Sequence, residues 1–310
     1  MTALSFALAF ALARQGAPDP QGARGPVRVD VHGVSGELRR NIRAHLSLVA
    51  RGADRDLEAA TIRVLHDRAP EEIRRALRPF GYYRPRIESE LVERGEGWRA
   101  RYRVDPGEPV RYGSVELTLT GAGSDDGVLR RVLPEVGVSE GEVLRHPEWE
   151  QAKQTLLNQA AARGYLDVAI ERARVEVDTT AGTARAVLRV ATGPRYRFGE
   201  IRWPSTPFTA EFMGRFVTFE PGEPFDLDAL LAMQRGLASS DYFRLVQVEP
   251  LRDRADSLRV PNDVQMELQQ RNSYTIGLGY GTDTGVRGTA AGRRRWLNPY
   301  GHRLGAELRA

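Results

Sequence analysis

Three stretches of the sequence share one plan and decide the fold. They read PFGYYRPRIESEL at residues 79–91, ARGYLDVAIERARVEV at residues 162–177 and SSDYFRLVQVEPL at residues 239–251. In each stretch a helical pattern stops at Gly or Asp, an aromatic residue follows, and an alternating stretch typical of a strand begins. The tyrosines of the three stretches are 83 and 77 residues apart. This spacing indicates a repeat unit of about 80 residues.

The stop residues and their aromatic neighbours are the candidate structural residues of these corners: Gly81, Tyr82, Gly164, Tyr165, Asp241 and Tyr242. Glycine adopts positive φ without steric cost, and aspartate tolerates it, so both suit the end of a helix. We therefore expect Gly81 and Gly164 to have positive φ and the adjoining tyrosine rings to pack on a sheet. A second landmark repeats as well, because EPVRYGSVELTL at residues 108–119 resembles PRYRFGEIRW at residues 194–203.

Hydrophobic periodicity predicts the order strand, helix, helix, strand, strand in each unit. In the first unit the expected elements are a strand at 27–31, a helix at 38–49, a helix from about Pro70 to Phe80, and strands at 84–93 and 98–104. The second unit repeats the order from 115 to 192, and the third repeats it from 201 to 270. Helices on one face of a three-stranded sheet make a small α+β sandwich. The predicted fold class is therefore α+β, in three tandem domains.

The C-terminal residues 273–310 have a different pattern. In the first stretch large apolar residues alternate with Thr or Gly, in the order Tyr274, Thr275, Ile276, Gly277, Leu278, Gly279, Tyr280 and Gly281. Residues 302–310 alternate in the same way, and residues 286–296 between them form a further candidate strand that ends in Trp296 near a membrane interface. Apolar-out, polar-in alternation is typical of a transmembrane barrel strand, while an ordinary soluble hairpin is the alternative reading.

Composition excludes several classes of function. The net charge is +4, from 45 basic and 41 acidic residues that are interleaved along the chain, so no basic stripe for nucleic acid is expected. There is no cysteine, and the five histidines have no metal-binding spacing. After residue 13 no stretch approaches the roughly 20 apolar residues of a membrane helix. We assign no catalytic, metal-binding or cofactor-binding residue, and we expect a protein that is not an enzyme.

A strand–helix–helix–strand–strand unit whose second helix closes on Gly-Tyr resembles the POTRA domain. Three such units before a Gly-rich alternating segment resemble the TamA type within the BamA/TamA superfamily of outer-membrane assembly factors. PFGYY in the first unit, Gly199 in the third, and GYGTDTG ahead of PYGH carry this resemblance. The expected borders are a signal peptide and leader at 1–25, POTRA domains at 26–106, 107–195 and 196–272, and the start of an outer-membrane β-barrel at 273–310. The signal peptide rests on the apolar run ALSFALAFALA, which ends in a small-x-small triplet.

The resemblance implies a function as well as a fold. It implies a factor of a diderm outer membrane, with POTRA domains in the periplasm, that binds unfolded β-barrel or autotransporter clients by β-augmentation. The strand at 274–281 would form one side of the seam where client strands enter. The implied partners are a TamB-like inner-membrane-anchored protein, the clients and outer-membrane lipid. A general BamA-type insertase and a soluble or peripheral POTRA scaffold are the alternatives. Because the third barrel strand is the last one present, the sequence leaves open a fragment of a longer protein or a truncated gene.

Overall fold

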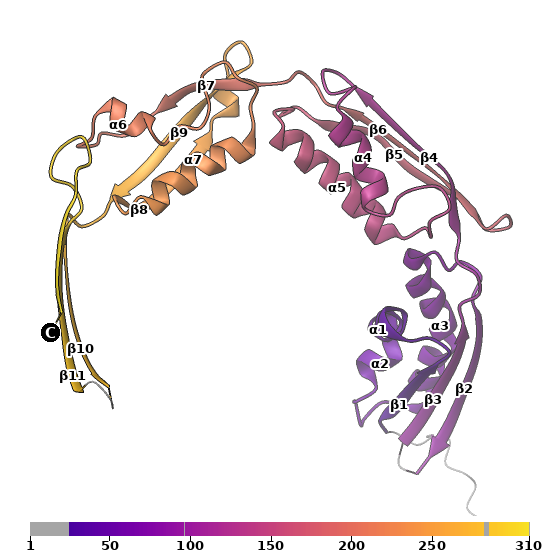
Figure 1. Cartoon of the computed structure of the whole chain (residues 1–310). Coiled ribbons are helices and arrows are strands. Elements are labelled where there is room, and N and C mark those ends of the chain that lie inside the picture. Colours follow the sequence, from indigo (N-terminus) through magenta and orange to yellow (C-terminus); the bar gives the residue numbers. More distant parts are fainter. Residues whose placement is uncertain (1–24, 96, 282–284, 310) are drawn as a thin grey trace, which may run out of the picture. The chain divides into compact units, whose positions relative to one another are not determined.

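The structure, a computed structural model, describes residues 25–95, 97–281 and 285–309. The predicted signal peptide therefore lies outside the described residues. The chain divides into two compact bodies. One contains the residues up to 113 together with 140–147 and 177–184, and the other contains 114–139, 148–176 and 185–310. The described residues form four three-stranded sheets, and Figure 1 shows helices on one face of each of the first three.

The first sheet has the strand order β1-β3-β2. Its strands are β1 (Val27–His32), β2 (Arg86–Arg94) and β3 (Gly97–Asp105). Strand β1 runs parallel to β3, and β2 runs antiparallel to it. Helices α1 (Gly36–His45), α2 (Ser47–Arg51) and α3 (Ala59–Leu77) cover one face, and the 3₁₀ turn η1 (Arg78–Phe80) leads back to the sheet. Ile42, Ile62 and Tyr102 are fully buried between these layers, so this unit has its own core.

Two details of the first unit correct the predictions from periodicity. The second helix begins at Ala59 and not near Pro70, which lies inside α3. Proline removes one backbone donor there, but buried Ile62 and Ile73 on either side hold the helix against the sheet. The helix predicted at 38–49 is two helices, because Leu46 is extended, with φ −75° and ψ 110°, and ends α1.

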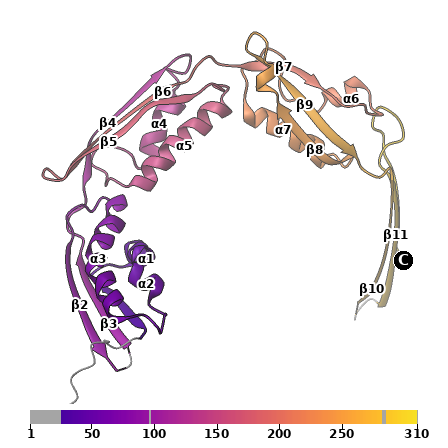
Figure 2. The same cartoon turned by 180° about the vertical axis from the view of Figure 1, so that it is seen from behind.

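The second and third sheets confirm the predicted order of strand, helix, helix, strand, strand. The second, of order β4-β6-β5, contains β4 (Arg111–Thr120), α4 (Gly127–Glu135), α5 (His146–Ala162), β5 (Ala169–Asp178) and β6 (Thr183–Ala191). The third, of order β7-β9-β8, contains β7 (Arg197–Arg202), α6 (Ala210–Gly214), α7 (Leu227–Ser239), β8 (Phe243–Pro250), the 3₁₀ turn η2 (Arg252–Arg254) and β9 (Arg259–Leu268). Seen from behind, α4 and α5 again lie on the same face of their sheet (Figure 2).

The fourth sheet consists of strands alone. It contains β10 (Asn272–Gly281), β11 (Gly285–Arg294) and β12 (Leu304–Arg309), all antiparallel, in the order β10-β11-β12. This order leaves β10 at one edge. The prediction of three alternating strands in 273–310 is confirmed as secondary structure.

Candidate functional site

The corners at Gly81 and Gly164 repeat one geometry. Their φ values are 87° and 91°, so the prediction of positive φ at both is confirmed. The carbonyl of Gly81 accepts a hydrogen bond from the backbone N–H of Val110 at 2.9 Å, and that of Gly164 accepts one from Tyr196 at 2.7 Å. In both cases the donor belongs to the segment that leads into the following sheet. Each corner therefore connects two consecutive sheets through its backbone.

Neither position has room for a Cβ atom. A Cβ atom on Gly81 would lie 2.6 Å from the carbonyl oxygen of Leu144, and one on Gly164 would lie 2.9 Å from that of Phe225. Leu144 and Phe225 occupy the same place in their units, in the loop before the second helix. Because the close atoms are backbone atoms, they cannot turn aside as a flexible side chain would. The sequence predicted the turn at these glycines, but it gave no sign of this contact.

The loops that meet these glycines are built alike. The guanidinium of Arg111 donates to the carbonyl of Gly141 at 2.8 Å, and that of Arg197 donates to the carbonyl of Gly222 at 2.8 Å. These arginines belong to the repeated VRYG and YRFG sequences. The second repeat landmark therefore supports the loop against which the glycine of the preceding corner packs.

The aromatic residues of the first two corners are both at least half-buried. Tyr82 is half-buried against the first core. Tyr165 is buried, and its hydroxyl donates to the carboxylate of Asp126 at 3.3 Å. The same carboxylate caps α4 through the N–H of Val128, at 3.0 Å, and accepts from Arg163 at 2.8 Å. Burial and the nearby Asp126 charge raise the pKa of Tyr165, so the ring stays neutral and ties the corner to the helix.

The third corner differs because its stop residue carries a charge. Asp241 has φ 66°, as the sequence suggested for a residue that replaces glycine. Its carboxylate accepts hydrogen bonds from the guanidinium groups of Arg295, at 3.1 Å, and Arg293, at 3.5 Å. Burial alone would raise the pKa of Asp241, but these two arginines outweigh it and hold the pKa below 3.8. The corner thus forms an ionic link to the C-terminal sheet.

This link predicts a pH dependence. Since the folded-state pKa of Asp241 is lowered, the carboxylate stabilises the fold above its ordinary pKa of 3.8, and this stability is lost as the pH falls through the folded-state value. We expect the free energy of unfolding to fall more steeply between about pH 5 and pH 2 in the wild type than in Asp241→Asn. Urea unfolding followed by tryptophan emission measures it, and equal slopes in the two proteins would contradict the ionic link.

Tyr242 extends the link through its hydroxyl group. That hydroxyl donates to the carbonyl of Gly301 at 2.5 Å and accepts from the guanidinium of Arg303 at 2.8 Å. The same guanidinium lies 4.2 Å from the ring centroid of Tyr242 and donates to the carbonyl of Ser240. Gly301 belongs to the PYGH turn between β11 and β12 and is close to the ring of Phe212. Its turn is therefore held against the third unit by both polar and aromatic contacts.

An aromatic group, here called the Trp296 cluster, completes the junction. Its members are Phe208, Phe212, Tyr242 and Trp296. The Phe208 ring meets those of Tyr242 and Trp296 edge to face, with centroids 5.3 and 5.9 Å away. Trp296 has only 9% of its surface exposed. Trp296 is thus part of the core of the third unit, a burial that the sequence did not predict. That it also lies near a membrane interface stays a prediction.

The C-terminal sheet has one apolar face that nothing in the described chain covers. Tyr274, Ile276 and Leu278 are 80%, 83% and 85% exposed. The register pairs Ile276 with Ala290 and Ala290 with Leu308, so small and apolar residues continue across this face. Thr275, Gly277 and Gly279 lie on the other face because successive side chains alternate. Tyr280 and Gly281 complete the β10 backbone.

No group of three or more His, Asp or Glu side chains in the described residues could hold a metal ion. Within the same residues, no helix is both long and apolar enough to cross a membrane.

Two family models match the chain. The first TamA POTRA domain matches residues 28–106, and the POTRA model described as a surface antigen variable number repeat matches residues 110–193. Together they cover more than half of the sequence. The chain belongs to the POTRA-domain proteins of the BamA/TamA superfamily. The first two sheets with their helices are thus POTRA domains, and the resemblance seen in the sequence is confirmed at the level of the family.

One solved structure supports the fold, and two others match less well. BamA from Haemophilus ducreyi lacking POTRA domains 1–3 matches with a TM-score of 0.52 and 17% identity, over 64% of this chain and 37% of that one. The BamA POTRA3-5 structure from Haemophilus influenzae matches with a TM-score of 0.43 and 13% identity, over 81% and 100% of the two chains. CdiB from Acinetobacter baumannii matches with a TM-score of 0.37 and 13% identity, over 80% and 46%. This POTRA protein spans less than half the length of the BamA chain from H. ducreyi and of the CdiB chain.

Proposed function

We propose that this POTRA protein is an outer-membrane assembly or translocation factor whose strand β10 receives a strand of an unfolded client. One observation carries the proposal: β10 is an edge strand with an exposed apolar face, and its sheet is tied to the third unit through Asp241, Tyr242 and the Trp296 cluster. A free strand edge presents unpaired N–H and C=O groups that can bind a strand from another chain.

The proposal divides the chain as the sequence suggests. A signal peptide and leader would occupy residues 1–25, POTRA domains 26–106, 107–195 and 196–272, and the first strands of an outer-membrane β-barrel 273–310. Two features support a membrane-facing role for the last segment. The face with Tyr274, Ile276 and Leu278 is apolar, and the opposite face carries Thr, Gly and charged residues. This is the alternation expected of strands between lipid and an aqueous interior. The POTRA domains would then lie in the periplasm.

The corners connect consecutive units of the chain. Gly81 and Gly164 each lie against the loop that precedes the second helix of the following unit. Asp241 contacts β11 and the segment after it. In all three units, therefore, the corner after the second helix contacts the segment that follows the unit. The edge strands of the three sheets are β1 and β2, β4 and β5, and β7 and β8.

The partners are proposed from the family match alone. The TamA-type model over residues 28–106 favours a TamB-like inner-membrane-anchored protein docking on the first POTRA domain. Unfolded outer-membrane proteins or autotransporters would be the clients, with outer-membrane lipid around the barrel. No cofactor, catalytic residue or nucleic acid enters this proposal.

Two alternatives make different predictions about the C-terminal sheet. A general BamA-type insertase would use β10 in the same way but would act on all outer-membrane barrels. A soluble or peripheral POTRA scaffold would bind its partners through the POTRA edges, and its C-terminal sheet would never enter a membrane. The exposed apolar row of Tyr274, Ile276 and Leu278 favours the first two over the scaffold.

Gly279→Pro tests the proposal in the protein as the cell makes it. Proline removes one backbone donor from β10, and a lost buried hydrogen bond lowers client assembly on the order of tenfold. Leu278→Ile is the matched control, because it keeps every backbone group and the apolar face, and we expect almost no change. The measurement is the amount of folded client in outer-membrane fractions. Equal assembly with Gly279→Pro and Leu278→Ile would favour the scaffold.

A further inference from the structure

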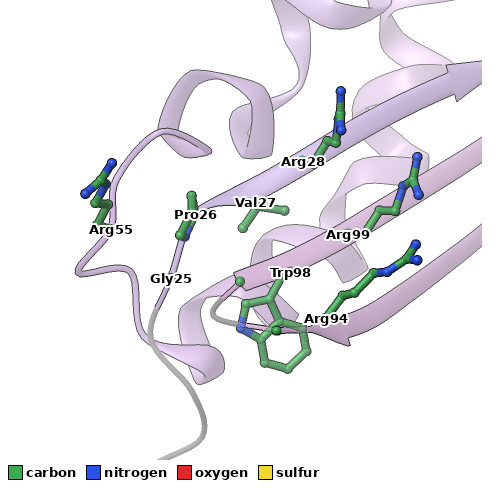
Figure 3. A pocket seen from close by; sticks show the side chains of 10 residues that line it. Gly25, Pro26, Val27, Arg28, Arg55, Arg94, Trp98 and Arg99 are labelled. Carbon is green, nitrogen blue, oxygen red and sulfur yellow. The ribbon is translucent and has the colours of Figure 1, made fainter.

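One end of each strand of the first sheet borders an open cavity of about 1120 Å³. Strand β1 begins there at Val27, β3 begins at Gly97, and β2 ends at Arg94. Figure 3 shows the cavity from close by. The lining residues that matter for its chemistry are Pro26, Arg28, Arg55, Arg94, Trp98 and Arg99.

Three of these arginines lie side by side on one face of the sheet. Arg28 of β1 is the register partner of Arg99 of β3, and Arg94 of β2 is opposite Gly97, two residues before Arg99. Since side chains alternate along a strand, all three point away from the helices, and Figure 3 shows them extending from the same face. The N–H of Trp98 donates to the carbonyl of Pro26 at 2.9 Å and holds the start of β1 against β3.

The charges at this end of the sheet are poorly balanced. Asp30 accepts a hydrogen bond from Arg99 at 2.8 Å and also interacts electrostatically with Arg28, but in the described part of the chain no carboxylate forms an ion pair with Arg28, Arg55 or Arg94. Towards the other end of the same face, Arg101 pairs with Glu90 at 3.1 Å. Like charges placed opposite each other weaken a sheet. A bound anion would reduce the repulsion between these arginines.

We propose that this cavity binds a phosphate-bearing anion, either free or as a lipid headgroup. Guanidinium groups bind phosphate oxygens in pairs of parallel hydrogen bonds. Three of them on adjacent strands offer several N–H donors on one face of the sheet, which suits a group with several acceptor oxygens better than one planar carboxylate. Arg55, in the loop that follows α2, adds a fourth positive charge at the rim. None of the lining residues belongs to β10, although Arg94 is the last residue of the edge strand β2.

The test titrates the whole chain with inorganic phosphate, and separately with phosphatidylglycerol and phosphatidylcholine vesicles, at low ionic strength. Calorimetry gives the affinity, and the difference in emission between wild type and Trp98→Phe reports events at the cavity. We expect Arg28→Gln with Arg94→Gln to weaken binding about tenfold or more. The matched control, Arg86→Gln with Arg101→Gln, removes the same charge from the same face outside the cavity and should change the affinity less than about twofold.

The outcomes distinguish free phosphate from a lipid headgroup as the ligand, and they can overturn the proposal. Binding of free phosphate supports a soluble ligand, while binding of phosphatidylglycerol vesicles alone supports a lipid headgroup. Absence of binding to either probe would overturn the proposal. So would equal losses in the two double variants, which would indicate general charge attraction, or tighter binding of polyglutamate than of phosphate, which would indicate an acidic protein partner.

Discussion

Replacing the corner glycines by alanine is expected to lower the free energy of unfolding by about 2–3 kcal/mol at each position. Gly81 and Gly164 both have positive φ, and a Cβ atom on either would lie within 3 Å of a backbone oxygen of the next unit. The loss combines backbone strain with a steric clash. Chemical denaturation followed by circular dichroism measures it.

Gly182→Ala separates the two causes. Gly182 has φ 69°, but no atom lies within 4 Å of where its Cβ would be. We therefore expect a loss of only about 1 kcal/mol, from the strained backbone alone. If Gly81→Ala and Gly164→Ala cost no more than Gly182→Ala, the contact between each corner and the following loop would have no energetic importance.

Trp296→Ala is expected to have a still larger effect, about 3–5 kcal/mol on the unfolding of the third unit. The side chain is 9% exposed and packs edge to face on Phe208 within the core. Trp296→Phe keeps an aromatic ring in the same place and should cost about 1–2 kcal/mol. Urea denaturation followed by circular dichroism compares the two variants.

Trp296→Ala should also weaken the attachment of the C-terminal sheet to the third unit. In Trp296→Ala we expect trypsin to cut the arginine-rich segment from Arg293 to Arg295 faster than in the wild type, because the contacts that hold this segment are weakened. A loss of stability below about 1 kcal/mol, with unchanged proteolysis, would show that the Trp296 cluster does not anchor the sheet.

Much of the fold follows from local patterns. The alternation in β1 and the glycine corners depend on residues near in sequence, and the strand expected at 27–31 is observed at Val27–His32. Helix α3 was misjudged because Pro70 favours a helix start locally, whereas burial of the residues before it decides the outcome. The break at Leu46 between α1 and α2 likewise has no clear signal in a continuous apolar periodicity.

The junction with the C-terminal sheet could not be predicted in the same way. Asp241 and Arg295 are distant in sequence, as are Tyr242 and Gly301, so periodicity carries no information about their pairing. The aromatic content of 206–216 and the PYGH turn were visible, but only packing shows that they meet. By contrast, the apolar face of β10 was readable residue by residue, since alternation alone places Ile276 and Leu278 together.

Site-specific crosslinking tests the central claim most directly. The protein has no cysteine of its own, so a single cysteine can be placed in turn at each position from Tyr274 to Gly281 and crosslinked to a client's terminal strand during assembly. If β10 pairs with client strands through its free edge, crosslinks should form with a period of two residues, because alternate side chains point to opposite faces. An active protein in which none of these positions crosslinks to any client would contradict strand exchange at β10.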